Sequence, residues 1–361
     1  METKFTNEEI VKEVTRFLIE KNDVWKKLYE GYAKDILGIQ DVQSNQCKHL
    51  IQYEERGVKL KNTLGKTFFN LYSKITDAKR GNTFDIRASG ESIGDITIKN
   101  NGTARVDIKK TKHERIKRLF GIEAKDSYNE DLDFIHLLKQ KKLNEAALHS
   151  KEHEIESLML NMFDEKTGKN KPIKIRPVTM GNAYIQFTTP VSASNHKKLP
   201  HFQASIDGGA KGGGIDILAR ICHNNEVFDR LAVIEIKDEN TSSEPQKVVL
   251  QQAIAYATFI AFLLRQDFGN LWWTIFTRHK DSDSLIKTPH QLDFYNKRKY
   301  PIDVISLMPK SDFEKSEDKG CLKDLVVNVP DKEPVILHPC TLYYIKKEDG
   351  SIDFEGSLLD E

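Results

Sequence analysis

The sequence predicts a mixed α/β protein whose second half is organised around a largely buried sheet. Strand-like runs from about residue 174 to residue 237 are rich in β-branched and aromatic residues, and an apolar stretch of helical length follows at 245–265. Hydrophobic residues make up 39% of the 361 residues and charged residues 30%. That balance is typical of a folded globular chain and excludes a disordered one.

The first 140 residues are predicted to form a separate α+β domain of unknown role. Its helical stretches are the first 30 residues, which are amphipathic, and residues 48–77. Its strands are expected at Thr83–Arg87, Asp95–Lys99 and Arg105–Lys109, with an Asn101-Gly102 turn between the last two. A basic run, Lys109–Arg118, follows, and weakly periodic polar residues lead to a boundary near residue 140.

The remainder, residues 141–361, is predicted to contain a helix, a meander of strands, a second helix and further strands. The helices are expected at Asn144–Phe163 and Pro245–Arg265, and the second is apolar on nearly every face, which indicates burial on two sides. The strands are expected at Lys174–Thr179, Tyr184–Thr189, Gly214–Ile221, Leu231–Lys237, Leu271–Arg278, Ile302–Leu307 and Val335–Lys346. This order predicts a mixed central sheet flanked by helices.

Charge, cysteine content and the distribution of apolar residues indicate which partners and which cellular compartment to expect. The formal net charge is +1, so any nucleic-acid contact must come from local positive clusters. Four cysteines without a CxxC spacing argue against a zinc knuckle or a redox pair. The polar, acidic start is unlike a secretory signal, and the near-apolar run Ala253–Leu264 is too short to span a bilayer. We therefore expect a cytoplasmic protein with no membrane partner, and homo-oligomerisation stays open.

The residues best suited to chemistry lie around one predicted strand hairpin. Glu235 and Lys237 are two positions apart, so strand periodicity places both side chains on one face, together with Val233. Asp216 lies on the preceding strand, and residues 223–225 (HNN) can turn the chain between the two. The hairpin is therefore expected to bring Asp216 close to Glu235.

Two carboxylates and a lysine inside apolar strands are costly unless they are compensated. Mg²⁺ relieves the repulsion between carboxylates, because it prefers hard oxygen ligands from one or two of them together with water and a substrate phosphate. Mn²⁺ accepts the same ligands. A lysine beside such an ion can orient or deprotonate a water molecule. The alternative is a salt bridge across the hairpin, since Glu and Lys two apart are common on strands.

The wider spacing resembles the PD-(D/E)XK nuclease superfamily, which includes restriction enzymes, Holliday-junction resolvases and helicase-linked exonucleases. Eighteen residues separate Asp216 from the following Glu-Ile-Lys, although an isoleucine stands before Asp216 where the motif has proline. Gln252 and Tyr256, four apart on the next helix, resemble the QxxxY motif of the exonuclease-like branch. The resemblance covers about residues 145–280 and implies a restriction-endonuclease-like core.

The superfamily also tends to carry an acidic residue on the helix before the catalytic sheet. In residues 151–163, Glu152 is predicted to lie roughly 50° from the centre of the apolar stripe and Glu156 about 90° from it. The segment EHEIESLM also resembles the E-x-E-L helix of the resolvases, in which the first glutamate is associated with the metal. We therefore expect Glu152 in this role, with Glu156 as the alternate.

The resemblance implies a Mg²⁺-dependent or Mn²⁺-dependent nuclease acting on nucleic acid, most favourably DNA, in restriction, phage defence or repair. Asp216 and Glu235 would bind the metal, helped by Glu152 and the Ile236 carbonyl. Lys237 would position the attacking water, and the pair Gln252 and Tyr256 would orient the lysine or contact the substrate. The alternative is a catalytically inactive nucleic-acid-binding module on the same fold.

Two further segments could form a binding site, although each also has a simpler interpretation. Asp95, Asp107 and Lys109 repeat the Asp…Asp-x-Lys order across the Asn-Gly hairpin, but no helix with Gln and Tyr follows them, so a polar hairpin is favoured over a second site. The glycine-rich loop 205–214, with Lys211, could approach a phosphate through its amides. A flexible connection is the simpler interpretation of that loop.

Overall fold

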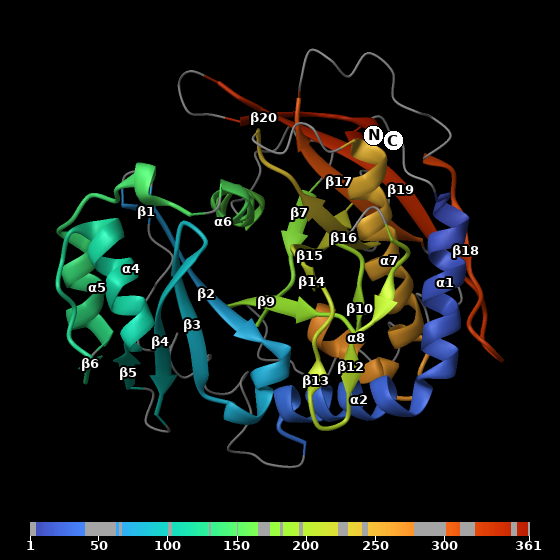
Figure 1. Cartoon of the computed structure of the whole chain (residues 1–361), viewed down its shortest axis with the longest axis horizontal. Coiled ribbons are helices and arrows are strands. Elements are labelled where there is room, and N and C mark those ends of the chain that lie inside the picture. Colours follow the sequence, from blue (N-terminus) through green and yellow to red (C-terminus); the bar gives the residue numbers. More distant parts are fainter. Residues whose placement is uncertain are drawn as a thin grey trace.

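A computed structural model describes the chain as a mixed α/β protein with two main sheets (Figure 1). The described residues are 5–39, 63–64, 67–99, 103–129, 131–149, 151–164, 174–180, 183–194, 198–222, 230–239, 245–277, 301–310, 322–347 and 352–359. The predicted helix over 48–62, the Asn101-Gly102 turn and the turn at 223–225 lie outside them. The mixed α/β class predicted from the sequence is confirmed.

The central sheet has seven strands in the order β18-β19-β17-β16-β15-β7, with β20 paired to β19. β16, β17 and β19 run parallel, whereas the other pairings are antiparallel. The strand bounds are β7 Lys174–Pro177, β15 Ile217–Cys222, β16 Arg230–Ile236, β17 Ile302–Pro309, β18 Leu325–Val327, β19 Val335–Lys346 and β20 Ile352–Glu355. The predicted strands over these ranges are confirmed.

Helices cover both faces of the central sheet (Figure 1). On one face α7 (Gln246–Leu264) packs against β16 and β17 and is itself covered by α1 (Asn7–Glu20). On the other face the apolar side of α6 (Lys151–Asp164) packs against the alternate side chains of β15 and β16. This alternation follows from the two-residue period of a strand, and it puts Val233 and Leu218 on the α7 side.

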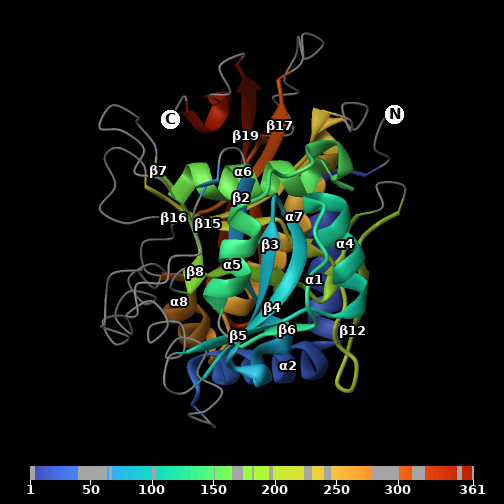
Figure 2. The ribbon, with the colours of Figure 1, turned by 90° about the vertical axis from the view of Figure 1, so that its left-hand side faces the viewer.

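The second sheet, here called the N-terminal sheet, follows the order β14-β9-β2-β3-β4-β5-β6, with β1 beside β2 and β8 beside β9. Its face is covered by α4 (Lys110–Phe120) and α5 (Asp131–Lys139), which lie in front of β3 and β4 in Figure 2. The strand bounds are β1 Thr63–Leu64, β2 Thr67–Lys74, β3 Thr83–Ala88, β4 Glu91–Ile98, β5 Ala104–Asp107, β6 Ser127–Tyr128, β8 Thr179–Met180, β9 Ala183–Thr188 and β14 Gly214–Ile215.

Short elements complete the description. Two small antiparallel pairs join β10 (Val191–Ser192) to β11 (His201–Phe202) and β12 (Ala204–Ser205) to β13 (Gly209–Ala210). The remaining helices are α2 (Asn22–Leu37), α8 (Gly269–Thr277) and the 3₁₀ turns η2 Ile75–Arg80, η3 Glu145–Ala147 and η6 Ser357–Leu359. The helix predicted from residue 144 therefore begins at residue 151, after a separate 3₁₀ turn.

Segments from both sides of residue 140 are interleaved in the fold. β2 pairs in parallel with β9, so the N-terminal sheet contains strands from the two predicted domains. α1 and α2 share one hydrophobic core with α7 and α8. The Thr6 side chain accepts from the Glu9 N–H, and the Glu9 side chain accepts from the Thr6 N–H, so α1 starts with a complete capping box. The boundary near residue 140 stays a prediction, and neither sheet is divided there.

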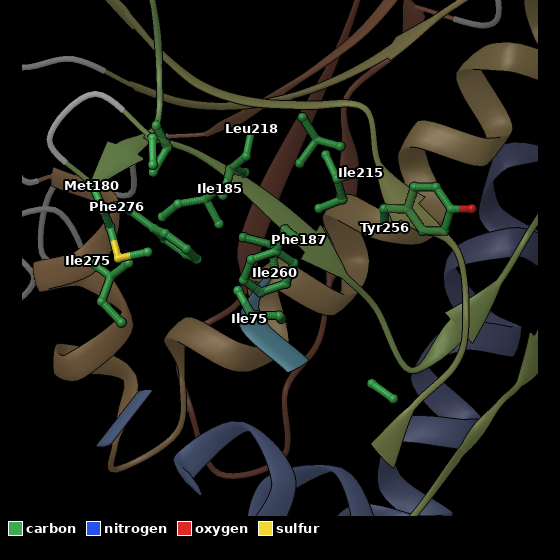
Figure 3. Close-up of a cluster of buried hydrophobic side chains, with 14 of the residues drawn as sticks. Ile75, Met180, Ile185, Phe187, Ile215, Leu218, Tyr256, Ile260, Ile275 and Phe276 are labelled. Carbon is green, nitrogen blue, oxygen red and sulfur yellow. The ribbon is translucent and has the colours of Figure 1, made fainter. Parts of the chain in front are cut away.

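Two predicted elements are wrong in type. Residues 271–277 form α8 rather than a strand, and Trp272 and Trp273 are both buried instead of alternating across a sheet. Residues 67–74, predicted as helix, form β2. Both segments are short and apolar, and such runs carry no clear period that separates a strand from a buried helix. Figure 3 shows Phe276 of α8 beside Phe187 of β9, one of the ring contacts that hold this helix against the sheet.

α7 is longer than the apolar run expected from the sequence. By length and composition alone its 19 residues could cross a membrane, which corrects the expectation that this stretch is too short. However, 89% of its most apolar window is buried inside the protein. Burial on all sides is the pattern of a core helix.

Candidate metal centre

The site lies at one edge of the central sheet, where β15 begins beside the end of its antiparallel neighbour β16. Ile217 pairs with Ile234 in the antiparallel register, so Asp216, one residue earlier, stands opposite Glu235. The Ile236 N–H donates a hydrogen bond of 2.8 Å to Asp216 Oδ2. This bond holds the Asp216 carboxylate against the end of β16, as the hairpin argument requires.

Three acidic side chains converge at this point. Glu152, from the first turn of α6, joins Asp216 and Glu235, and one carboxylate oxygen from each lies within 4.8 Å of the others. Such spacing lets three oxygens share one cation. A hard divalent ion is the ion that an all-carboxylate set prefers.

Lys237 is anchored beside the three carboxylates. Its Nζ lies 3.2 Å from Glu152 Oε1 and 3.7 Å from Glu235 Oε1. Its backbone is fixed on both sides, because the Lys237 N–H donates to Leu307 O at 3.0 Å and the Tyr344 hydroxyl donates to Lys237 O at 3.2 Å. Lys237 is buried, with only 7% of the residue exposed, so its ammonium is confined beside the carboxylates.

The electrostatics of the cluster are unfavourable without a cation. Burial, together with the negative charge of Asp216, raises the pKa of Glu235 well above its ordinary value. Burial also raises the pKa of Asp216 to about 6, although Lys237 and the Ile236 N–H act in the opposite direction. Glu235 Oε2 is buried and has no hydrogen-bond donor among the residues that the structure describes. A buried acceptor without a donor, facing two other carboxylates, fits a bound divalent cation.

The upstream glutamates differ from the expected order of burial. Glu156 is buried at 8% exposure and accepts a hydrogen bond of 3.1 Å from the Tyr72 hydroxyl, whereas the Glu152 side chain is 32% exposed. The prediction that Glu152 faces the core most directly is therefore wrong. Burial, followed by the charge of Asp216, raises the pKa of Glu156 to about 8. Glu152 nevertheless belongs to the cluster. It lies in the first turn of α6, where its Oε1 is 3.2 Å from Lys237 Nζ.

The QxxxY pair lies next to the carboxylates. Gln252 Nε2 donates to Tyr256 Oη over 3.5 Å, and the charges of Glu235 and Asp216 add to the burial that raises the pKa of Tyr256. Figure 3 shows Tyr256 at the edge of a buried cluster, with its hydroxyl directed away from the other labelled side chains. A Cβ on Gly213 would lie 1.8 Å from that hydroxyl, so the loop before Asp216 can pass Tyr256 only as glycine.

That contact changes the interpretation of the glycine-rich loop. Gly212 is equally confined, since a Cβ there would lie 2.4 Å from Thr189 O. The Gly213 carbonyl also accepts from the Thr189 N–H at 2.8 Å. These glycines are therefore packed against β9 and α7 instead of forming a flexible connection, whereas Lys211 is exposed.

The second Asp…Asp-x-Lys hairpin is occupied by ammonium groups. Asp95 pairs in register with Asp107, yet Lys112 Nζ lies 2.9 Å from Asp95 Oδ1 and 3.2 Å from Asp85 Oδ1. Lys109 Nζ lies 3.2 Å from Asp95 Oδ2. Lysine charges thus neutralise the aspartates where a metal would otherwise be needed, as the polar-hairpin interpretation expects.

Two contacts of the site left no signal in the sequence. Tyr344 and Tyr72 reach Lys237 and Glu156 from strands 107 and 84 residues away in the chain. Nothing in the local pattern of either tyrosine distinguishes it from an ordinary buried strand residue. The Ile236 carbonyl stays a predicted ligand, and the described contact of this residue with the cluster is through its N–H.

Comparison of the chain with protein-family models, with curated proteins and with solved structures gives no match. The case for a metal centre therefore rests on the geometry of the cluster. The case for a particular chemistry rests on the spacing of Asp216, Glu235, Lys237, Gln252 and Tyr256 along the chain.

Metal binding is expected to depend on pH. Carboxyl groups with raised pKa bind more protons in the folded than in the unfolded state, so the free energy of unfolding of the metal-free protein should fall as pH rises from about 5 to 8. A cation displaces those protons, so its stabilisation should rise over the same interval. At about 100 times its Kd at pH 8, Mn²⁺ should add about 2.7 kcal/mol, and less at pH 5.

Thermal unfolding in Mn²⁺ and in EDTA, at both pH values, measures this difference. Glu152→Gln should reduce the Mn²⁺ effect. Glu154→Gln is the matched control on the same helix, because Glu154 pairs with Lys151 and lies outside the carboxylate cluster. Equal Mn²⁺ stabilisation in wild type and in Glu152→Gln would contradict the metal centre.

Proposed function

We propose that this protein is a Mg²⁺-dependent nuclease of the PD-(D/E)XK type, active also with Mn²⁺, that hydrolyses phosphodiester bonds in nucleic acid, most favourably DNA. The observation that carries the proposal is the convergence of Glu152, Asp216 and Glu235 around the anchored Lys237. Those four residues match, one by one, the acidic and basic positions that the resemblance implies.

The order of elements around the site supports the same proposal. α6 precedes the antiparallel strands β7, β15 and β16, and α7 and α8 then follow before the parallel strand β17. Apart from the additional helix α8, this is the helix, meander, helix, strand order expected of a restriction-endonuclease-like core. Glu152 lies on α6, Glu235 on β16, and Gln252 and Tyr256 on α7, while Asp216 directly precedes β15 and Lys237 directly follows β16. The elements of this order therefore also position the site.

Charge balance explains why a cation belongs in the mechanism. Three ionised carboxylates and one ammonium leave the centre with an excess of negative charge, which would repel a phosphodiester. When bound, the divalent ion would neutralise that excess and polarise a phosphoryl oxygen. Without the ion the same residues favour protonation over charge, as the raised pKa of Glu235 indicates.

The protein's own groups would then position the nucleophile. Lys237 Nζ is held between Glu152 and Glu235, where it can donate to a water molecule and fix its direction of attack. Asp216 is oriented by the Ile236 N–H, and this hydrogen bond would keep its carboxylate in place as one of the groups that hold the ion. Gln252 and Tyr256 form the polar edge of α7 beside Glu235 and would contact the lysine or the substrate.

A cleavage assay with end-labelled and internally labelled DNA and RNA, single-stranded and double-stranded, tests the proposal. Cleavage is expected in Mg²⁺ or Mn²⁺ and not in EDTA, and Lys237→Met should reduce it on the order of 100-fold or more. Glu154→Gln should retain it. The substrate panel also separates DNA from RNA and end cutting from internal cutting.

The other outcomes are equally informative. Salt-sensitive binding without cleavage at any metal concentration would favour the inactive nucleic-acid-binding module. Neither binding nor cleavage on any of these substrates would overturn both functions. The biological setting, whether restriction, phage defence or repair, follows from the substrate and the mode of cutting once these are measured.

A further inference from the structure

A polar pocket opens directly beside the carboxylate cluster. It has a volume of about 220 Å³, and Asp216 and Glu156 belong to its wall. At about 30 Å³ for each water molecule, this is room for roughly seven waters, more than a structural water site needs. The pocket lies between α6, β9, the start of β15 and the strands β2 and β3, so both main sheets contribute to it.

The surface exposed to the pocket is mainly polar, and buried tyrosines and aliphatic residues support it from behind. Tyr72 and Tyr184 stand 6.0 Å apart between ring centroids at 55°, and Val178 and Ile185 line the same space. The Tyr72 hydroxyl donates to Glu156 Oε1, and the Tyr184 hydroxyl donates to the Leu160 carbonyl at 3.1 Å. Both hydroxyls are engaged with the protein and both residues are only 2% exposed, so an occupant would meet mainly the polar groups of the pocket.

The polar rim carries no uncompensated positive charge. Arg87 donates to Asp85 Oδ2 at 2.9 Å and to Gln186 Oε1 at 2.9 Å, and its guanidinium lies 4.1 Å from the centre of the Tyr72 ring. A phosphate group would therefore meet an arginine that is already paired with a carboxylate, and would lie close to Asp216. A neutral occupant with hydrogen-bonding edges fits these charges better than an anion does.

We propose that this pocket receives one unstacked nucleobase of the substrate, from a nucleotide adjacent to the scissile phosphate. The inference rests on the proposed nuclease function, since the metal centre places the phosphate at Asp216 and the pocket begins at the same residue. Gln186, Arg87 and Glu156 line the pocket and would meet the polar edge of the base. Enzymes that hold a base outside the stack recognise it by hydrogen bonds to such an edge.

Gly214 provides a way to fill the pocket without disturbing the core. It lines the pocket, and a Cβ built on it meets no atom within 4 Å, so Gly214→Leu adds a side chain into open space. Gly31, in α2, also has nothing within 4 Å of an added Cβ, and Gly31→Leu is the matched control. Mn²⁺ stabilisation, measured as above, should stay unchanged in Gly214→Leu, which verifies that the carboxylate cluster is intact.

The probe is 2-aminopurine, whose fluorescence rises when the base leaves the stack. It is placed at successive positions of an oligonucleotide around the mapped cut, and the uncut complex is held with Lys237→Met protein. A several-fold rise is expected at one position next to the cut, lost when Gly214→Leu is added and retained with Gly31→Leu. In wild-type background, Gly214→Leu should slow cleavage of the normal oligonucleotide more than cleavage of one that is abasic at that position.

Cleavage with no fluorescence rise at any position, or with a rise that Gly214→Leu does not change, would overturn the base pocket and leave the nuclease function standing. Equal slowing of normal and abasic substrates by Gly214→Leu would also overturn it. If wild-type protein neither binds nor cleaves nucleic acid, the nuclease function fails and the base pocket fails with it.

Discussion

Replacing Glu235 with glutamine should remove metal-dependent cleavage and, at the same time, stabilise the metal-free protein at alkaline pH. Glu235 is buried, its Oε2 has no donor among the described residues, and it faces Asp216 and Glu152. The neutral amide is nearly isosteric but cannot supply the charge that a divalent cation requires. We expect a loss on the order of 10³-fold, equivalent to ~4 kcal/mol of transition-state stabilisation.

The stability effect has a definite sign. A carboxyl whose folded-state pKa is raised weakens the fold as pH rises above its ordinary value, and the cost is complete only above the raised pKa. Glu235→Gln removes this cost, so its free energy of unfolding in EDTA should exceed that of wild type at pH 8. At pH 4, where the carboxyl is protonated in both states, the two proteins should be nearly equal.

Urea unfolding at the two pH values and cleavage under saturating Mg²⁺ measure the two effects separately. Glu154→Gln serves again as control, because it makes the same chemical change on a half-buried carboxylate outside the cluster. A variant that loses cleavage and is also less stable at pH 8 would show Glu235 to be a structural partner of Lys237. In that case the salt-bridge interpretation of the hairpin would prevail.

The sequence predicts those parts of the site that depend on local periodicity. The spacing of Glu235 and Lys237 on one strand is enough to place both side chains on one face, and the hairpin register then places Asp216 opposite Glu235. The four-residue spacing of Gln252 and Tyr256 works in the same way on α7. The period of a strand or a helix determines which side chains share one face, and this can be predicted without the tertiary structure.

The parts that were wrong or missed depend on packing between distant segments. Helical periodicity ranked Glu152 as the more core-facing glutamate, but it is Glu156 that is buried, because Tyr72 of the N-terminal sheet offers it a hydrogen bond. The same sheet supplies Arg87 to the pocket, although it precedes the region of resemblance. No single-segment pattern predicts which of two sheets lies over a given helix face.

The secondary structure shows the same difference between features set by local periodicity and features set by packing between distant segments. The long helix α7 was placed within one residue at each end, and the helical stretch predicted over the first 30 residues divides into α1 and part of α2, whereas α8 was predicted as a strand. α8 becomes a helix in a setting where Trp272 contacts Phe187 of β9 and its indole N–H donates to Tyr29 O of α2. Those partners lie 85 and 243 residues away in sequence, so the local composition, which favours β structure, is overridden by tertiary contacts.

Phe259→Ala should destabilise the whole protein cooperatively, because segments from both sides of residue 140 are interleaved in the fold. Phe259 is fully buried on α7, and its ring lies 5.6 Å from Trp25, 4.6 Å from Tyr29 and 6.4 Å from Phe187. Trp25 and Tyr29 come from α2, and Phe187 comes from β9. Removing a buried phenylalanine of this kind costs about 3–5 kcal/mol.

Because α7 joins the N-terminal helices to the central sheet, the loss should appear in the whole protein at once. Tryptophan fluorescence, which senses Trp25 and the α8 indoles in this core, and far-ultraviolet circular dichroism should report coincident urea transitions, both shifted by Phe259→Ala. Val326→Ala, at an exposed strand position, should change stability by less than about 0.5 kcal/mol. Two separate transitions, only one of them shifted, would instead support independent domains divided near residue 140.

The same variant connects stability with the site. Tyr256 lies one helical turn before Phe259, and its hydroxyl is confined by Gly213, so a core that loosens around Phe259 also releases the loop that leads to Asp216. Cleavage by Phe259→Ala should therefore disappear on heating together with the fluorescence transition, several degrees below the wild-type midpoint. If activity is lost well before that transition, α7 moves locally without global unfolding, and the core and the metal centre are less tightly coupled than their shared helix implies.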